Sequence, residues 1–145
     1  MLTYQIDTPE RRLSAWKEFR DKLAQLTPDE QLDEVASFFS RTPIGSRSLD
    51  FYTPDSWPTP WEILYDSLYC QSSISLLMYY TLSYMSSFND RIQLRLIDDG
   101  EDRYLVPVID DQFILNYELG AITTLSNIEV TTVADFNNNE IKQYT

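Results

Sequence analysis

Cys70 is the only cysteine of the 145-residue chain and carries its best potential nucleophile. It stands at the join of two apolar segments in "PWEILYDSLYCQSSISLLMYYTL", residues 60–82. Unpaired N–H groups at the start of a helix stabilise a thiolate and donate to an oxyanion, so a cysteine placed there is a candidate for acyl-transfer chemistry. The residues that follow it predict such a helix, because six of them fall on one helical face with the neighbouring rows filled: Ile74, Leu77, Met78, Thr81, Leu82 and Met85.

A thiol nucleophile needs a base, and the chain contains no histidine. Without an imidazole, no side chain is suited to take the thiol proton or to return it to a leaving group, which excludes the Cys-His-Asp mechanism within this chain. Two interpretations of Cys70 stay open. It is either a small buried hydrophobe, or a nucleophile whose base is atypical or comes from a partner.

Threonine-proline pairs predict the helices that precede Cys70. Thr8 caps a first helix, Thr27 and Glu30 form a candidate capping box for a second, and Thr59 and Glu62 repeat that box for a short third helix. The first two helices follow each other closely, so we expect a helical hairpin over residues 1–40.

Residues 41–60 are rich in proline and predict an irregular connection across the surface. Trp57 in this segment and Trp61 just after it, both in "SWPTPW", are the candidate binding residues. One interpretation is an aromatic platform for a partner, since tryptophan is enriched at binding hot spots. In the other, both rings pack over the Cys70 helix and fix the loop.

From Arg91 onwards the apolar residues alternate as they do in strands. Asp99 and Gly100 between two strand patterns predict a hairpin, and "IEVTTV", residues 128–133, predicts a later strand. We expect an antiparallel meander of three to five strands. Pro107 lacks an N–H for the ladder and predicts an edge position or a bulge.

The order of these elements resembles the transglutaminase-like members of the papain-like superfamily. The resemblance runs from Trp57 to Leu125, and it implies a cysteine-headed helix packed on an antiparallel sheet. The family also has a histidine on a strand after the helix and an orienting aspartate or asparagine on the next strand. By order, Arg103 or Tyr104 falls near the histidine's place and Asn116 in "FILNYE" at the acid's place. The candidate catalytic residues are therefore Cys70, Tyr104 and Asn116.

The net charge of −12 argues against a nucleic-acid partner, because Lys and Arg are what hold phosphate backbones. The acidic turns at Asp98, Asp99, Glu101, Asp102, Asp110 and Asp111 could gather around calcium, but aspartate is also simply a favoured turn residue. We find no signal peptide and no apolar run of the roughly 20 residues that a membrane span needs. One cysteine cannot form an internal disulfide, which favours a reducing compartment.

We therefore expect one α+β domain over residues 1–145. It comprises a helical hairpin (1–40), a Pro/Trp-rich connection (41–60), a transglutaminase-like core (61–125) and a C-terminal strand and tail (126–145). The main functional hypothesis is a non-catalytic structural or assembly protein of a tailed bacteriophage, which is in the host cytoplasm during assembly and then in the virion. Its partners would be other virion or assembly proteins, with a homo-oligomer left open, and it would need no metal or other cofactor. The alternative is a cysteine acyl-transfer enzyme, such as a peptidase or amidase, with Cys70 as nucleophile.

Overall fold

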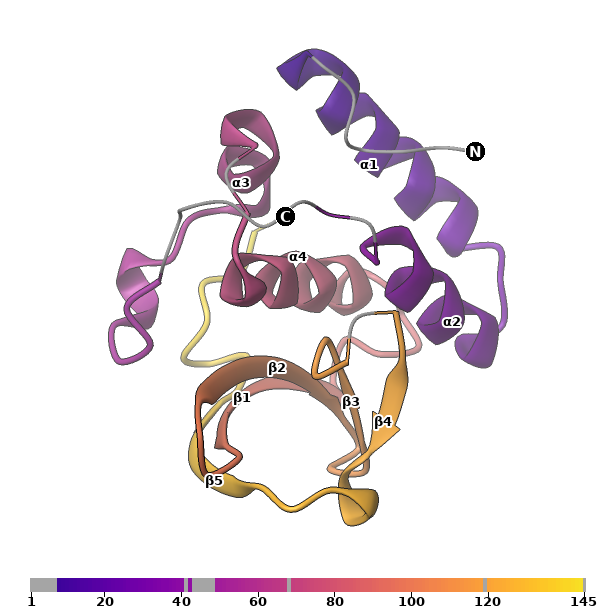
Figure 1. Ribbon diagram of the computed structural model, residues 1–145. Coiled ribbons are helices and arrows are strands. Elements are labelled where there is room, and N and C mark those ends of the chain that lie inside the picture. Colours follow the sequence, from indigo (N-terminus) through magenta and orange to yellow (C-terminus); the bar gives the residue numbers. More distant parts are fainter. Residues whose placement is uncertain (1–7, 41, 43–48, 68, 119, 145) are drawn as a thin grey trace.

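The helices lie on one side of a strongly curved antiparallel sheet (Figure 1). The structure is a computed structural model that describes residues 8–40, 42, 49–67, 69–118 and 120–144. Within these residues the helices are α1 (Pro9–Leu23), α2 (Pro28–Phe38), α3 (Pro60–Asp66) and α4 (Gln71–Ser83), with 3₁₀ turns η1 (Pro54–Ser56) and η2 (Leu125–Asn127). None of the described helices has the length and apolar character that a bilayer crossing requires.

The predicted helix starts are confirmed. Thr8 accepts a hydrogen bond from the Arg11 N–H at the start of α1, and both reciprocal capping boxes form, at Thr27 for α2 and at Thr59 for α3. These caps satisfy N–H groups that have no partner inside their helix. They are local interactions over three residues, which is why the sequence predicts them.

The sheet contains five strands in the order β4-β3-β2-β1-β5, and every neighbouring pair is antiparallel. Their bounds are β1 (Ile92–Asp98), β2 (Arg103–Ile109), β3 (Phe113–Leu115), β4 (Ile122–Thr124) and β5 (Thr131–Phe136). The hairpin predicted at Asp99 and Gly100 joins β1 to β2, and Gly100 has the positive φ of 97° that such a turn requires. Strands β1 to β4 form the expected meander.

Two strand predictions need correction. The last strand begins at Thr131, three residues later than predicted, because Ile128 and Val130 pack against the concave face of the sheet instead of pairing. It then returns to the far edge beside β1. Pro107 lies in an inner strand and forms no bulge, but at this position β2 is paired only with β1, so the proline is locally at an edge. The β2–β3 ladder pairs only Val108 and Ile109 of β2, so it ends before the proline.

Helix α4 is the centre of the main core and packs against β1 and β2. Nearly all of its residues are buried, including its serines at 72, 73 and 75, so its apolar and polar sides both face protein. The opposite, concave face of the sheet has a smaller core of Ile97, Val106, Val108 and Ile114. Side chains on a strand alternate between these two cores, which decides which of them can approach Cys70.

Candidate functional site

Cys70 is the N-cap of α4, as predicted. Its sulfur accepts a hydrogen bond from the Ser73 N–H, with 3.4 Å between S and N, and its own N–H donates to the Ser73 hydroxyl at 2.9 Å. The thiol is half-buried and unpaired with any other cysteine. The first turn of α4 contains no acidic residue, so no carboxylate of the helix opposes a negative sulfur there.

Asn116 joins the turn after β3 to the first turns of α4. Its amide donates to the Gln71 carbonyl at 2.9 Å and to the Ser75 hydroxyl at 2.8 Å. In return the Gln71 amide donates to the carbonyls of Asn116 and Leu105, at 3.2 and 2.9 Å. Asn116 is only 5% exposed and has a φ of 62°, a left-handed conformation that asparagine tolerates better than most residues. This reciprocal set, the Gln71–Asn116 clasp, fixes the head of α4 against β2 and the β3 turn.

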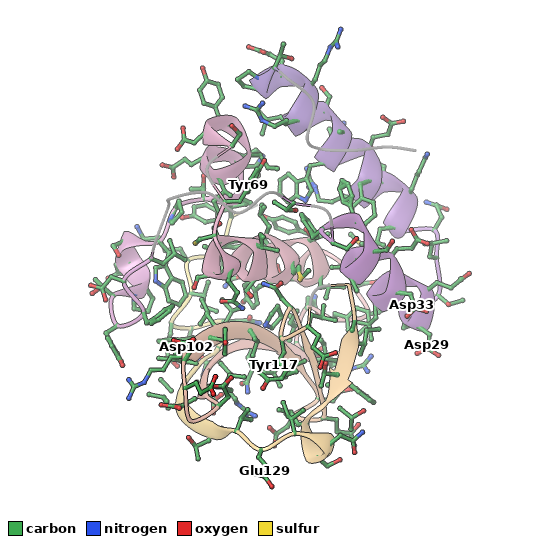
Figure 2. All side chains as sticks on the ribbon, in the orientation of Figure 1. Asp29, Asp33, Tyr69, Asp102, Tyr117 and Glu129 are labelled. Atoms are coloured by element: carbon green, nitrogen blue, oxygen red, sulfur yellow. The ribbon has the colours of Figure 1, made fainter. Side chains whose placement is uncertain are left out.

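The structure thus brings Asn116 to the helix that Cys70 heads, but it does not bring Tyr104 there. Tyr104 packs with the concave-face core and meets Tyr117 edge-on, with ring centroids 5.8 Å apart, whereas its neighbour Leu105 packs with α4 in the main core. Figure 2 shows Tyr117 inside the curve of the sheet, on the side away from α4. Partial burial raises the pKa of the Tyr104 phenol, and Asp99 and Asp102 add to this effect, so the phenol is a poor base at neutral pH.

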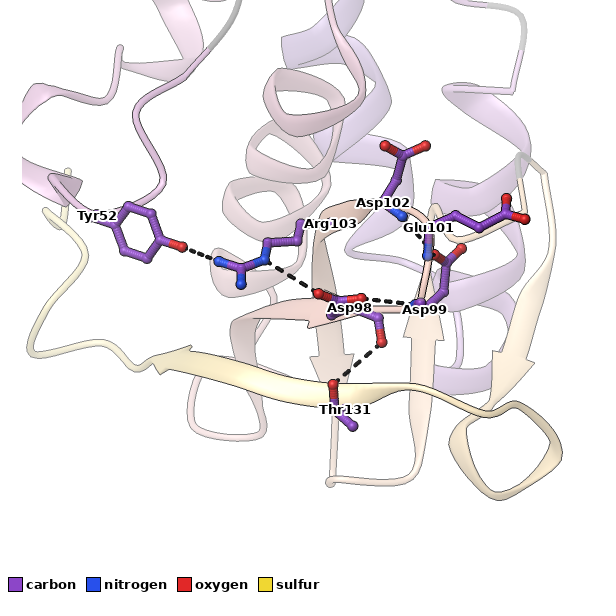
Figure 3. A network of polar contacts seen from close by, with 8 residues as sticks. Tyr52, Asp98, Asp99, Glu101, Asp102, Arg103 and Thr131 are labelled. Atoms are coloured by element: carbon purple, nitrogen blue, oxygen red, sulfur yellow. Dashed lines mark hydrogen bonds and ion pairs between the residues drawn. The ribbon is translucent and has the colours of Figure 1, made fainter.

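Arg103, the other residue near the expected histidine position, is held by polar contacts at the β1–β2 hairpin (Figure 3). Its guanidinium donates to the Tyr52 hydroxyl and to the Asp98 carboxylate. A guanidinium stays protonated in proteins and does not act as a general base.

The two candidate binding tryptophans, Trp57 in the connection and Trp61 in α3, are both packed against other rings. Trp57 is 6% exposed, meets Phe136 edge-on at 5.1 Å and donates its indole N–H to the Asp50 carbonyl at 2.7 Å. Trp61 meets Trp16 edge-on at 5.9 Å, and Trp16 in turn donates to Thr81 of α4. Of the two, Trp57 also lines a surface groove.

That groove, which the sequence analysis did not predict, has a volume of about 550 Å³. It lies between the connection, the start of α3 and the C-terminal segment. Trp57 and Tyr144 contribute aromatic rings to its lining, and Asp50, Asp55 and Glu62 contribute carboxylates. Its walls come from residues 49–62 and from 142 and 144, which are about eighty positions apart in the chain, so no local motif marks it.

The acidic turns do not form a metal centre within the residues that the structure describes, where no three His, Cys, Asp or Glu side chains are grouped to hold an ion. Asp110 pairs with Arg91 at 2.6 Å, and Asp111 pairs with Arg95 at 2.7 Å. At the β1–β2 hairpin, Asp98 and Asp99 accept backbone N–H groups of the turn. Asp99 thereby has a pKa below its ordinary value. These contacts are those of turn residues.

No protein-family model matches the chain, and neither does any curated protein. Solved structures of LapG from Legionella pneumophila do match it. The calcium-bound form is 20% identical over 92% of this chain and 78% of that chain, with a TM-score of 0.76. Two further LapG structures, one of them EGTA-treated, are each 21% identical over 89% of this chain and 74% of that chain, with TM-scores of 0.74.

Nothing in these matches points to a bacteriophage, so the viral origin inferred from the sequence has no support from the comparisons. The likeness covers far more of the chain than the segment from Trp57 to Leu125 that first suggested it. At 20% identity it is a likeness of fold, and function does not follow from fold alone. The chain has the transglutaminase-like α+β fold, with Cys70 at the head of its central helix.

Proposed function

We propose that this chain is a transglutaminase-like domain that binds other proteins and does not carry out acyl transfer by itself. The observation that carries the proposal is the composition of the site: Cys70 heads α4 in a chain that contains no histidine. Acyl transfer by a thiol needs a group that accepts and returns a proton near neutral pH.

The polar side chains around the head of α4 do not replace that group. Gln71, Ser73, Ser75 and Asn116 are amides and hydroxyls, which do not titrate near neutral pH. Both Asn116 donor bonds go to α4, so this side chain serves to hold the helix. Tyr104 packs in the concave-face core.

The partners of such a domain are proteins, with a second copy of the chain as one option. A virion role is one form of this proposal, and it would need a viral partner. No cofactor is required for binding of this kind.

The fold comparison favours a second candidate, acyl transfer by Cys70 with a base that a partner supplies. The half-buried thiol at the start of a helix, on a scaffold shared with LapG, is the observation behind it. In that reaction the sulfur would attack a carbonyl carbon, form a thioester and release an amine or alcohol that takes up the thiol proton. Water would then cleave the thioester and regenerate the thiol.

Alkylation of the thiol tests the non-catalytic proposal, because Cys70 is the one cysteine and labelling therefore reports on a single site. The native protein and the urea-unfolded chain would be treated with iodoacetamide at pH 7, and intact mass would be followed with time. The Cys70→Ser variant corrects for labelling elsewhere. For a binding domain we expect the native rate to be no faster than that of the unfolded chain.

A native rate more than about tenfold above the unfolded rate would mean an activated thiolate, and would overturn the non-catalytic proposal in favour of the second candidate.

A further inference from the structure

The groove at the start of α3 combines a buried ring with exposed charges. Trp57 is almost fully buried in its lining, and Tyr144 is half-buried there. Tyr144 is fixed by ring contacts with Trp61 and Tyr80, at centroid distances of 5.8 and 5.6 Å. The Lys142 carbonyl, on the same side of the groove, accepts a hydrogen bond from the Tyr80 hydroxyl at 2.7 Å. The C-terminal wall of the groove is therefore held in place by contacts with α3 and α4.

The charges around the groove are unbalanced. Among the described residues that line the groove, three carboxylates, from Asp50, Asp55 and Glu62, face one ammonium group, from Lys142, so these four side chains have a net charge of −2. All four side chains are exposed and therefore accessible to a partner. Asp55 forms no ion pair or side-chain hydrogen bond with any residue in the described ranges.

The other two carboxylates already accept hydrogen bonds within the protein. Asp50 accepts the Tyr52 N–H at 3.0 Å and the Thr53 hydroxyl at 2.8 Å, and these bonds hold its pKa below the ordinary value. Glu62 accepts the Thr59 N–H with one oxygen as part of the α3 capping box. Each carboxylate has about four acceptor positions, so both keep capacity for a further donor.

We propose that this groove binds an extended segment of a partner protein through its Lys or Arg side chains. The inference rests on the proposed function, because it names the surface and the partner chemistry of a protein-binding domain. A long basic side chain lays its aliphatic stem along apolar surface and keeps its charged head beside carboxylates. Arginine adds a planar fork that matches a carboxylate and stacks on an aromatic ring, so arginine should bind more tightly than lysine here.

The charge of the groove disfavours other occupants. Phosphate groups of a nucleic acid would be repelled by a groove of net charge −2 in a chain of net charge −12. In the described part of the chain, the groove carboxylates do not make a group arranged for a metal ion.

The test is fluorescence anisotropy with a fluorescein-labelled, end-blocked peptide of sequence Gly-Arg-Gly-Lys-Gly-Arg-Gly, at about 0.15 M salt where charges beyond about 8 Å are screened. The groove variant Asp50→Asn, Asp55→Asn, Glu62→Gln keeps side-chain acceptors for the loop and for the helix cap. We expect it to weaken binding by about tenfold or more, since it removes the complementary charges. A peptide with Gln in place of each basic residue should not bind.

A matched control variant removes three exposed acidic charges elsewhere, through Asp29→Asn, Asp33→Asn and Glu129→Gln. Glu129 lies at the opposite end of the molecule from α3 (Figure 2). This control should weaken binding by less than about twofold, because Asp29 and Asp33 lie on α2 and Glu129 lies at the far end of the sheet, all away from the groove (Figure 2). An equal loss in both triple variants would mean attraction to the overall charge and would overturn the proposal.

The Lys142→Gln variant should have the opposite effect on peptide binding, and this test does not depend on the folding of the triple variant. It removes the cation that lines the groove in the described part of the chain, and we expect tighter binding by about twofold to threefold. Unchanged or weaker binding would contradict the proposal. Displacement of the peptide by an equal concentration of spermidine would also overturn it, because the groove would then select small polyamines and not a protein segment.

Failure of this inference is distinguishable from failure of the proposed function. If the groove variant binds the peptide as well as the unmodified chain does, and Cys70 alkylation is slow, the domain is non-catalytic and binds through another surface. Fast Cys70 alkylation with a groove-dependent peptide signal would overturn the non-catalytic function and keep the groove.

Discussion

Helices α3 and α4 begin with the same reciprocal capping geometry, built from different atoms. At α3 the Thr59 hydroxyl accepts the Glu62 N–H at 3.0 Å, and the Glu62 carboxylate accepts the Thr59 N–H at 3.0 Å. At α4 the Cys70 sulfur accepts the Ser73 N–H at 3.4 Å, and the Ser73 hydroxyl accepts the Cys70 N–H at 2.9 Å. Sulfur is a weak acceptor, and cysteine is not among the favoured N-cap residues.

The difference shows that the two helices depend on their caps to different extents. Helix α3 has seven residues, and short helices gain little from internal hydrogen bonds. Helix α4 is buried along nearly its whole length and is clasped by Asn116, so its packing stabilises it with or without a strong cap. Capping therefore does not account for a thiol at position 70, where serine would do the same work better.

Loss of the Gln71–Asn116 clasp should have the largest effect on stability. The Asn116→Ala change removes one hydrogen-bond donor from the Gln71 carbonyl and one from the Ser75 hydroxyl, and it places alanine at a φ of 62°. We expect a loss of about 3 kcal/mol in the free energy of unfolding, measured by urea denaturation.

The Asn116→Gly variant separates the two causes, because glycine adopts a positive φ without strain but also lacks the amide. It should be more stable than Asn116→Ala by about 1 kcal/mol. Equal stability of the alanine and glycine variants would show that the left-handed conformation is not a source of strain.

Changes to the N-caps of α3 and α4 should alter the free energy of unfolding less than loss of the clasp does. The Thr59→Ala change should cost about 1 kcal/mol, the usual value for loss of a threonine N-cap. The Cys70→Ser change should be neutral or slightly stabilising, because a hydroxyl is the stronger acceptor. Urea denaturation of both variants checks this, and a Cys70→Ser loss as large as that of Thr59→Ala would contradict the comparison.

The smallest expected effect is on the pH dependence of stability at the start of α2. The Thr27 N–H and hydroxyl donate to Glu30 and lower the pKa of its carboxyl below the ordinary value of 4.5. A group with a lowered folded-state pKa adds stability above its unfolded pKa, and this stability is lost as the pH falls through the folded value. The α4 cap has serine in the equivalent place and has no such dependence.

We therefore expect a carboxyl-carbon NMR titration to place the Glu30 midpoint below 4.5. In the Thr27→Ala variant the midpoint should return toward the ordinary value, because the hydroxyl that donates to the carboxylate is gone. A midpoint that Thr27→Ala leaves unchanged would show that the capping box is not formed in solution.

Sequence reasoning went furthest where the interaction is local. The helix starts at Thr8, Thr27 and Thr59 and the hairpin at Asp99 and Gly100 depend on residues a few positions apart, and all four are as predicted. Pro107 is at an edge only locally, because β3 pairs with Val108 and Ile109 and does not reach the proline, and the sequence of β2 does not show where β3 ends. Of the three candidate catalytic residues, Cys70 and Asn116 lie at the same end of α4, but Tyr104 is on the other face of the sheet.

The sequence by itself determined the chemistry that is missing, because no arrangement of this chain produces an imidazole. It also determined the cysteine-headed helix and the order of helices and strands, since periodicity and caps act within a few residues. Only the tertiary structure decided which strand lies beside β1, which face of the sheet Tyr104 occupies, and how residues 49–62 meet 142 and 144 in one groove. Those features depend on burial between distant segments, which no local pattern specifies.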